Sequence, residues 1–221
     1  MKEHILIFIA SLLVGTGGYV GYSYVAAMNV PAPDQEEVKS AEIKKVDYDI
    51  EKAPSETLRG TISNMYGEIN WQSRVATEPA KLEGKRPIQQ GEQLSTGEDG
   101  TLLLEFNNDT TLEFDNDSVV DIIQTLPTSF VFMQEKGTVT YNQLPSSSTP
   151  LAVRVRHLLV RLLDGGITVT LEDDDPYIIV GGTQGTFEVA YNDNTLTSHR
   201  FTVNDGDTLI FDDETRTSDI Q

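Results

Sequence analysis

Most of this chain alternates between apolar and polar residues with a period of two, the pattern of a β-strand with one buried face. Successive side chains of a strand point to opposite faces of its sheet, so a half-buried strand shows this alternation. Residues 102–106 (LLLEF), 111–114 (TLEF) and 187–191 (FEVAY) follow the pattern most clearly. We therefore predict strands at these places.

Clusters of Asn, Asp and Gly separate the alternating segments. They lie at residues 107–109, 115–117, 192–194 and 204–207. These residue types tolerate a left-handed backbone and hydrogen-bond their own backbone, as tight turns require. Short strands that recur about every ten residues predict an all-β domain, either a compact sandwich or a short solenoid of stacked strands.

Two segments within this domain need separate treatment. Residues 145–150 (PSSSTP) are predicted to form a loop that divides the domain into two halves. Residues 151–163 (LAVRVRHLLVRLL) fit both a strand and one face of a helix. We favour a strand that runs through Arg156, with a bulge or break near His157.

A run of 24 residues without a formal charge extends from Ile5 to Met28. As a helix it would rise about 36 Å, enough to cross a hydrocarbon core of about 30 Å. Lys2 precedes the run and acidic residues follow it, so the positive-inside rule places the N-terminus in the cytoplasm. We expect a cytoplasmic tip at residues 1–4, a signal-anchor helix in the lipid bilayer over residues 5–28, and an extracytoplasmic remainder.

The alternative to a retained anchor is a cleaved signal peptide. Residues 25–27 (VAA) suit a cleavage site, but the apolar run exceeds the usual core of ~7–15 residues in such peptides. Residues 29–57 carry prolines and mixed charges with few apolar side chains, which predicts a linker or stalk. The all-β domain is then expected over residues 58–213, and a C-terminal tail over residues 214–221.

Composition excludes several classes of function. The chain has 16 Lys and Arg against 35 Asp and Glu, a formal charge of −19, and such a surface repels nucleic acid. It has no cysteine, which excludes disulfides, thiolate metal sites and cysteine nucleophiles. The carboxylates are too numerous for the sequence alone to select a catalytic pair.

Two pairs of segments within the domain echo each other. Residues 97–106 and 182–191 share the spacing of two glycines, a threonine and an alternating strand. A looser echo links residues 135–140 with residues 164–169. Such echoes predict stacked or duplicated β units, and the alternative is convergence among short strand-turn-strand pieces.

The segment from Gly91 to Phe114 (GEQLSTGEDGTLLLEFNNDTTLEF) resembles the core of the FecR-like domain family. In that family a glycine precedes a D-x-L-x-T-G motif, and two strands flank an Asp/Gly turn. The resemblance covers about residues 58–213. Similar motifs follow in the family's order at Gly137-Thr-Val, Gly166-Ile-Thr-Val, Gly185-Thr-Phe and Val203-Asn-Asp-Gly.

The resemblance implies a bacterial, membrane-tethered, extracytoplasmic all-β domain without known catalysis. FecR-type regulators pass a signal from an outer-membrane receptor to a cytoplasmic sigma factor, through a segment that precedes a single span. This chain has four residues before its predicted span and little length for a further receptor-contacting domain. We therefore do not expect direct contact with a sigma factor.

Calcium is the one candidate metal ion, and no other cofactor is expected. Asp173, Asp175, Asp205 and Asp207 lie in acidic turns and could supply hard oxygen ligands to a calcium site. No stretch of the sequence matches the EF-hand loop. The alternative is turn chemistry on a solvated acidic surface.

The histidines and Ser198 give no pattern typical of catalysis. A zinc site needs three or four ligands, more than His157 and His199 supply beyond the predicted span. Ser198 and His199 are adjacent, so on a strand they would face opposite sides of the sheet. We expect no catalytic residue and no enzymatic activity.

Two groups of side chains are candidates for binding. Arg154, Arg156 and Arg161 form a basic cluster that either pairs with acids across strands or contacts an anionic wall polymer. Trp71 and Tyr66 form a sugar-stacking platform if the tryptophan is not part of the core.

The function that we predict is a non-enzymatic sensory or protein-interaction module at the cell surface. Its partner would be an unidentified surface protein or glycan, and nucleic acid is not expected. A carbohydrate- or wall-binding β module and a calcium-stabilised surface scaffold are the alternatives.

Overall fold

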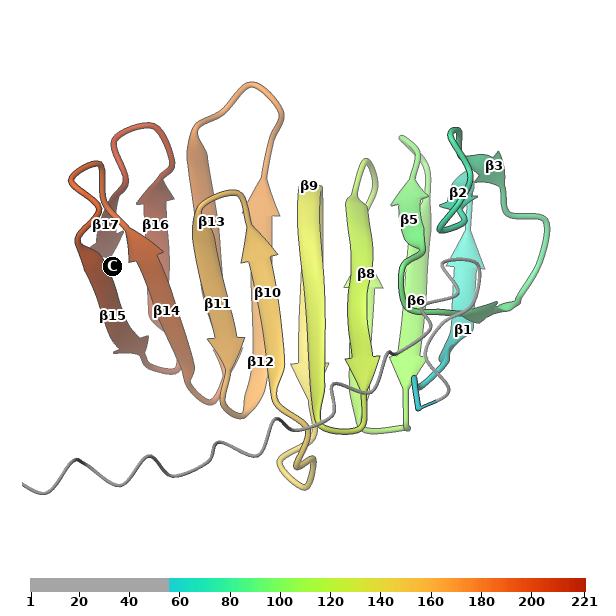
Figure 1. The fold of residues 1–221 in the computed structure, drawn as a ribbon, viewed down its shortest axis with the longest axis horizontal. Helices are drawn as coiled ribbons and strands as arrows, with labels where there is room; N and C mark the ends of the chain where they lie inside the picture. Colours follow the sequence, from blue (N-terminus) through green and yellow to red (C-terminus); the bar gives the residue numbers. More distant parts are fainter. Residues whose placement is uncertain (1–55) are drawn as a thin grey trace, which may run out of the picture. The chain divides into compact units, whose positions relative to one another are not determined.

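The computed structural model describes residues 56–221, which form 17 strands and no helix (Figure 1). The predicted all-β class is confirmed for these residues. The predicted anchor or signal peptide, and the predicted stalk up to residue 55, lie outside the described part. Within residues 56–221, no helix is long and apolar enough to span a membrane.

The strands form two layers that are joined through one long strand, β9 (Ser129–Gln143). In spatial order, sheet A contains β4 (Pro87–Ile88), β1 (Gly60–Tyr66), β6 (Thr101–Phe106), β7 (Thr110–Phe114), the second part of β9, β12 (Gly165–Leu171), β13 (Tyr177–Gln184), β16 (Thr208–Asp212) and β17 (Thr217–Ile220). Sheet B contains β3 (Ala80–Lys81), β2 (Ile69–Gln72), β5 (Gln93–Thr96), β8 (Val119–Leu126), the first part of β9, β10 (Leu151–Val155), β11 (Leu158–Leu162), β14 (Phe187–Asn192) and β15 (Ser198–Val203).

From β10 onward, consecutive hairpins alternate between the two sheets. Sheet A receives β6–β7, then β12–β13, then β16–β17, while sheet B receives β10–β11 and then β14–β15. Each hairpin after β10–β11 therefore pairs with a strand of the hairpin two before it, as β14 pairs with β11 and β16 with β13. The colours of Figure 1 run from one end of the sandwich to the other for this reason.

The alternation seen in the sequence places one apolar row of each strand between the sheets. Leu104 and Phe106 are fully buried, as are Phe187 and Val189, while the residues between them face outward. The ring centroids of Phe106 in sheet A and Phe130 in sheet B lie 5.4 Å apart. Aromatic contacts of this kind show that the two apolar faces pack against each other.

β9 passes from sheet B to sheet A at Gly137, whose φ of 84° lies in the left-handed region. A side chain there would overlap Ser118, whose hydroxyl bonds the backbone of Thr138. Beneath the crossing, Gln134 donates to the carbonyls of Gly137 and Val169 at 2.9 and 3.0 Å. The crossing is thus fixed by a glycine and a satisfied buried amide.

The structure refines three sequence-based expectations. Residues 151–163 form two strands of a hairpin, and the predicted break falls at Arg156 and His157, where Arg156 has a φ of 48°. The loop at residues 145–150 is present, but it does not separate two sheets, because β9 pairs with strands on both sides of it. The expected tail contains β17, which pairs with β16 and extends sheet A.

Candidate functional site

The outer face of sheet B carries arginines in register across four strands. Arg154 on β10 pairs with Leu159 on β11, Leu159 pairs with Ala190 on β14, and Ala190 pairs with Arg200 on β15. Residues that are paired directly across strands have side chains on the same face. Arg154, Leu159, Ala190 and Arg200 therefore form one row on the outside of the sandwich.

Two arginines of this face, Arg161 and Arg200, form ion pairs with the same carboxylate. Glu188 accepts two hydrogen bonds from Arg200, at 2.8 and 3.0 Å, and lies 3.6 Å from Arg161 in the neighbouring row. Arg154 makes no ion pair or hydrogen bond with any residue in the described part of the chain. Cross-strand pairing, one of the two predicted roles for the basic cluster, is thus found for Arg161. The patch as a whole is left with more positive than negative charge.

A shallow groove of about 290 Å³ crosses this patch. Leu159, Val189 and Ala190 give it an apolar lining, and Arg161, Glu188 and Arg200 complete it. The side chain of Leu159 remains 43% exposed. An apolar centre beside arginines is typical of surfaces that contact other proteins.

The charge of the outer face of sheet B changes from positive to negative towards β8. Asp121 on β8 pairs with Met133 on β9, which pairs in turn with Arg154. Burial raises the pKa of Glu135, and the charge of Asp121 and a hydrogen bond with it raise this pKa further. The outer face of sheet B is therefore acidic over β8 and β9 and basic from β10 to β15.

Arg156 does not belong to the basic patch, contrary to the predicted three-residue cluster. It lies in the β10–β11 turn and donates to the backbone carbonyls of Glu172 and Asp175, at 2.9 and 2.8 Å. The adjacent His157 bonds Asp213 through its ring at 3.0 Å. Because the turn ends the strand, Arg156 reaches the rim of the sandwich and ties the β10–β11 turn to loops of sheet A.

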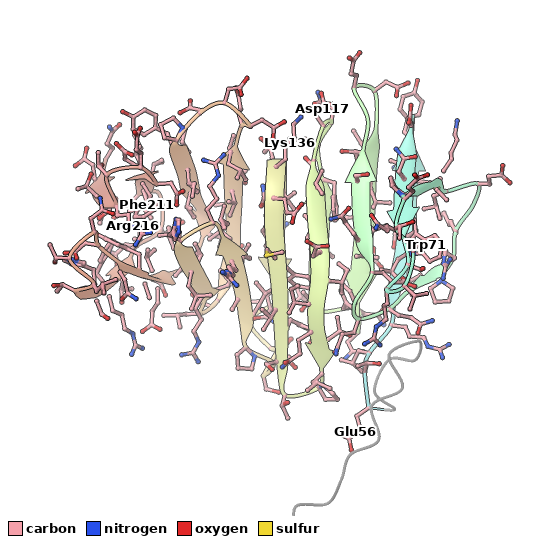
Figure 2. All side chains as sticks on the ribbon, turned by 45° about the horizontal axis from the view of Figure 1, so that its top comes forward. Glu56, Trp71, Asp117, Lys136, Phe211 and Arg216 are labelled. Carbon is pink, nitrogen blue, oxygen red and sulfur yellow. The ribbon has the colours of Figure 1, made fainter. Side chains whose placement is uncertain are left out.

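A second, acidic groove of about 600 Å³ lies at that rim, where β9 crosses between the sheets. Lys136 is its one basic residue, and its Nζ lies 2.8 Å from a carboxylate oxygen of Asp173. The hydrogen bond and charge of Asp173 raise the pKa of Lys136, with help from Asp117 and Asp174. Figure 2 shows Lys136 and Asp117 together at this rim. The acidic residues that line the groove are Glu98, Asp115, Asp117, Glu172, Asp173 and Asp174.

The four calcium candidates lie at two opposite ends of β13. Asp175 accepts the backbone N–H of Tyr177, the first residue of β13, at 2.9 Å. Asp207 accepts the backbone N–H of Gly182 through its carbonyl, at 3.1 Å. Five strand residues span about 17 Å, so the pair Asp173 and Asp175 is far from the pair Asp205 and Asp207. Within residues 56–221, no group of three or more His, Asp or Glu is placed to hold a metal ion.

Both histidines of the described part pair with aspartates. His199 lies 2.9 Å from Asp193 and stacks on Tyr191. The neighbouring Ser198 donates its hydroxyl hydrogen bond to Asn192, at 2.7 Å. Serine and imidazole thus point to different partners, as the strand periodicity predicts.

Trp71 lies on β2 and packs against the edge of the core. The guanidinium of Arg86 covers one face of its ring, 3.7 Å from the centroid, and also pairs with the buried Glu92 at 3.3 Å. Tyr66 ends β1 and is 71% exposed. One face of the predicted sugar-stacking platform is therefore already occupied by a protein cation.

The two predicted echoes differ in whether their segments are neighbours in a sheet. The segments of the looser echo lie side by side, since β9 and β12 pair as Thr138 with Thr170 and Thr140 with Thr168. The hydroxyls of these two pairs are 3.0 and 2.8 Å apart. The glycine-threonine echo leads into β6 of sheet A and β14 of sheet B, which do not pair with each other.

Two solved structures are similar in fold to part of this chain. They are crystal structures, at 2.50 and 1.65 Å resolution, of a candidate anti-sigma factor from Parabacteroides distasonis ATCC 8503. Their identities to this chain are 16% and 15%, each with a TM-score of 0.49. Each match covers 58% of this chain and 58% of the neighbour's length. No protein-family model and no curated protein matches the chain.

Sequence reasoning missed Arg200 as a member of the basic patch and gave no role to Arg74. Arg200 follows Glu188 by twelve positions, and the β14–β15 hairpin register brings them together. The Asn-Asp-Asn turn at residues 192–194 was the signal from which this pairing could have been found. Arg74 lies in an irregular segment after β2, where no periodicity predicts the position of a side chain.

Proposed function

We propose that the chain is a non-enzymatic, membrane-anchored, extracytoplasmic module of the FecR-like kind that binds another protein through the outer face of sheet B. The observation that carries this proposal is the exposed Leu159 among Arg154, Arg161 and Arg200, of which Arg161 and Arg200 share the carboxylate of Glu188. On a chain with a net charge of −19, a basic patch with an apolar centre attracts acidic surfaces and excludes water from the contact.

Three further observations support this function. The motifs that resemble the FecR-like family lie on β5–β7, β9, β12, β14 and β15, inside one continuous sandwich. The uncharged run at residues 5–28 is long enough for an anchor. A rigid sandwich also presents its outer face without rearrangement, which lowers the entropic cost of binding.

The binding face is tested by photo-crosslinking in cells that express the full chain. A photoreactive amino acid at position 159 should give a discrete product of higher mass. The matched control is position 179, on the outer face of sheet A, where Ile179 is 41% exposed against 43% for Leu159. Equal products from both positions, or none from position 159, would contradict the proposal.

The anchored topology is tested separately. Protease added to intact cells or spheroplasts should digest the β domain, and a sigma factor should not co-purify with the full chain. Complete protection of the β domain would place it in the cytoplasm and overturn the extracytoplasmic assignment.

A further inference from the structure

The C-terminal end of the sandwich has a free strand edge in each sheet. Within residues 56–221, β15 pairs only with β14 and β17 pairs only with β16. Sheet A continues from β9 through β12, β13 and β16 to β17, and sheet B continues through β10, β11 and β14 to β15. Each edge is thus the fourth strand after β9, and Figure 1 shows β15 and β17 together at this end. One partner can therefore reach both edges.

The free edge of β15 presents backbone groups at every second residue. In an antiparallel pair, alternate residues bond the partner strand, and the residues between them direct their N–H and C=O groups away from it. The N–H of Asp193 donates to the carbonyl of Thr197 at 3.0 Å, which sets this alternation for the β14–β15 hairpin. The residues of β15 whose backbone groups point away from β14 are therefore Ser198, Arg200 and Thr202.

β17 has the same property in sheet A. Thr208 and Gln221 bond each other through both backbone groups, at 3.0 and 2.9 Å. The alternation from this pair directs the backbone groups of Ser218 and Ile220 away from β16. Each sheet thus presents free donors and acceptors to a further strand, as in complexes that form by strand addition.

The edges at the N-terminal end of the sandwich are shorter. There the edge strands β3 and β4 have two residues each, and β4 begins with Pro87. Very short strands and prolines are two of the features that protect sheet edges from pairing with other chains. β15 has six residues, no proline and no shift of register against β14. Strand pairing between molecules is therefore expected at the C-terminal end.

Apolar side chains at the C-terminal end are incompletely covered. Phe201 pairs with the buried Val189, so it faces the space between the sheets, yet it is only partly buried. Ile220 pairs with the buried Leu209 and remains 45% exposed. Both side chains would lose contact with water if the two sheets continued into another molecule.

A second copy of the chain fits both edges at once. A two-fold axis perpendicular to the sheets places β15 against β15 of the copy and β17 against β17 of the copy, each pair antiparallel. A copy has the same spacing between its sheets and the same level edges, which a single added strand lacks. Arg200 on β15 is already paired with Glu188 of its own chain, which lowers the repulsion between the two copies of this arginine.

We propose that the C-terminal end of the sandwich binds a second copy of the chain, and that β15 and β17 each pair antiparallel with the same strand of the copy. Phe201 and Ile220 of both copies then pack together between the joined sheets. The contact leaves the outer face of sheet B open on both copies, so it does not depend on the proposed protein contact. Each chain carries a net charge of −19, so the association should strengthen as salt screens the repulsion.

Sedimentation equilibrium of the full chain, in a density-matched detergent at low and high salt, tests this inference. The mass should rise from that of a monomer to that of a dimer as the protein concentration approaches ~100 μM, because strand edges of six and four residues give a small, weak interface. It should not rise further, since the two-fold contact uses both edges. A monomer throughout, or continued growth beyond a dimer, would overturn the proposal.

A matched pair of proline variants locates the contact. Thr202→Pro removes an N–H that points away from β14, so the hairpin keeps its own hydrogen bonds while association should weaken roughly tenfold or more. Lys81→Pro makes the same change on β3, because the bond from the Leu82 N–H to the Ile69 carbonyl directs the N–H of Lys81 away from β2. That variant should associate like the wild type, and a cooperative melting transition checks that both variants fold. Equal association of Thr202→Pro and the wild type would show that the copies meet elsewhere.

Crosslinking gives a second measurement that does not rely on proline. The chain has no cysteine, so the variants Thr202→Cys and Lys81→Cys each carry one reactive thiol at an exposed position of an edge strand. With a short bismaleimide, Thr202→Cys should give a covalent dimer and Lys81→Cys should not. Dimers of both variants in equal yield, or of neither, would contradict the C-terminal contact.

Discussion

The two ends of the sandwich differ in how their polar groups are satisfied. At the C-terminal end, the Tyr191 hydroxyl lies 3.0 Å from the hydroxyl of Ser218, and the Tyr191 ring lies 4.8 Å from that of Phe211. At the N-terminal end, Trp71 and Arg74 each have a buried nitrogen without an acceptor. The hydroxyl of Tyr191 at the C-terminal end thus has a hydrogen-bond partner, whereas two buried nitrogens at the N-terminal end have none.

This difference follows from the regularity of the chain. The C-terminal end consists of the complete hairpins β14–β15 and β16–β17, whose register brings Tyr191 opposite His199 and aligns donors with acceptors. The N-terminal end contains the two-residue strands β3 and β4, joined by loops. Regular pairing satisfies polar groups locally, whereas irregular segments can leave polar groups without a partner.

The largest effect is expected from opening the core at the C-terminal end. Phe211→Ala removes a fully buried ring and should lower the free energy of unfolding by about 3–5 kcal/mol. Urea denaturation measures this loss. Val75→Ala, at a 57% exposed position of the N-terminal end, is the control and should change stability by less than about 0.5 kcal/mol. A loss below about 1 kcal/mol for Phe211→Ala would mean that the ring does not close the core.

A smaller effect is expected from the hydroxyl of Tyr191. Tyr191→Phe keeps the aromatic contacts but removes the bond to Ser218, and should cost about 0.5–1.5 kcal/mol. The double variant with Ser218→Ala should cost little more than Tyr191→Phe alone, since both changes remove the same bond. Fully additive losses in this double-mutant cycle would contradict the hydrogen bond.

The opposite end should respond differently to the loss of a polar group. Arg74→Met removes a guanidinium whose shielded Nη1 has no acceptor, so stability should stay the same or rise by up to about 1 kcal/mol. Urea denaturation of the full chain measures the change. A clear loss of stability would show that Arg74 has a partner in the folded protein, and the contrast between the ends would fail.

The smallest effect concerns pH and the β14–β15 turn. The pKa of Asp193 is lowered, first by its bond to His199 and then by the hydroxyl of Thr195 and the N–H of Thr197. A carboxyl with a lowered folded-state pKa stabilises the fold above its unfolded pKa of about 3.9, and this stabilisation is lost as the pH falls below that value.

Stability should therefore decrease from pH 6 to pH 3, and Asp193→Asn should make this decrease shallower. Because Asp193 is partly exposed, salt should weaken the effect. Urea denaturation at both pH values and at two salt concentrations measures it. An identical pH slope in the wild type and in Asp193→Asn would mean that this carboxyl does not contribute.

Much of the fold could be predicted because strand periodicity is a local property. The buried rows at Leu104 and Phe187 follow directly from alternation, and the break near His157 follows from a basic pair within an apolar run. β17 was missed because Thr217–Ile220 is a short, polar edge strand with little apolar alternation. The sharing of β9 by both sheets depends on how the segment around Gly137 packs, which periodicity does not encode.

The binding surfaces depend on distances that the sequence does not contain. Arg154 and Arg156 are two residues apart, yet one lies on the sheet face and the other at the rim, because a turn separates them. Asp175 and Asp207 belong to similar acidic turns but lie at opposite ends of β13. Their positions follow from sheet register, which is set by hairpins far apart in the chain.

The alternating placement of hairpins also bears on how the molecule is made. Each hairpin after β9 docks onto a strand synthesised earlier, so assembly can follow translation from the N-terminus, without waiting for later segments. Duplication or deletion of two successive hairpins would change the length of the body by one step and preserve its cross-section. Evolution could thus vary the distance between its two ends without redesigning the core.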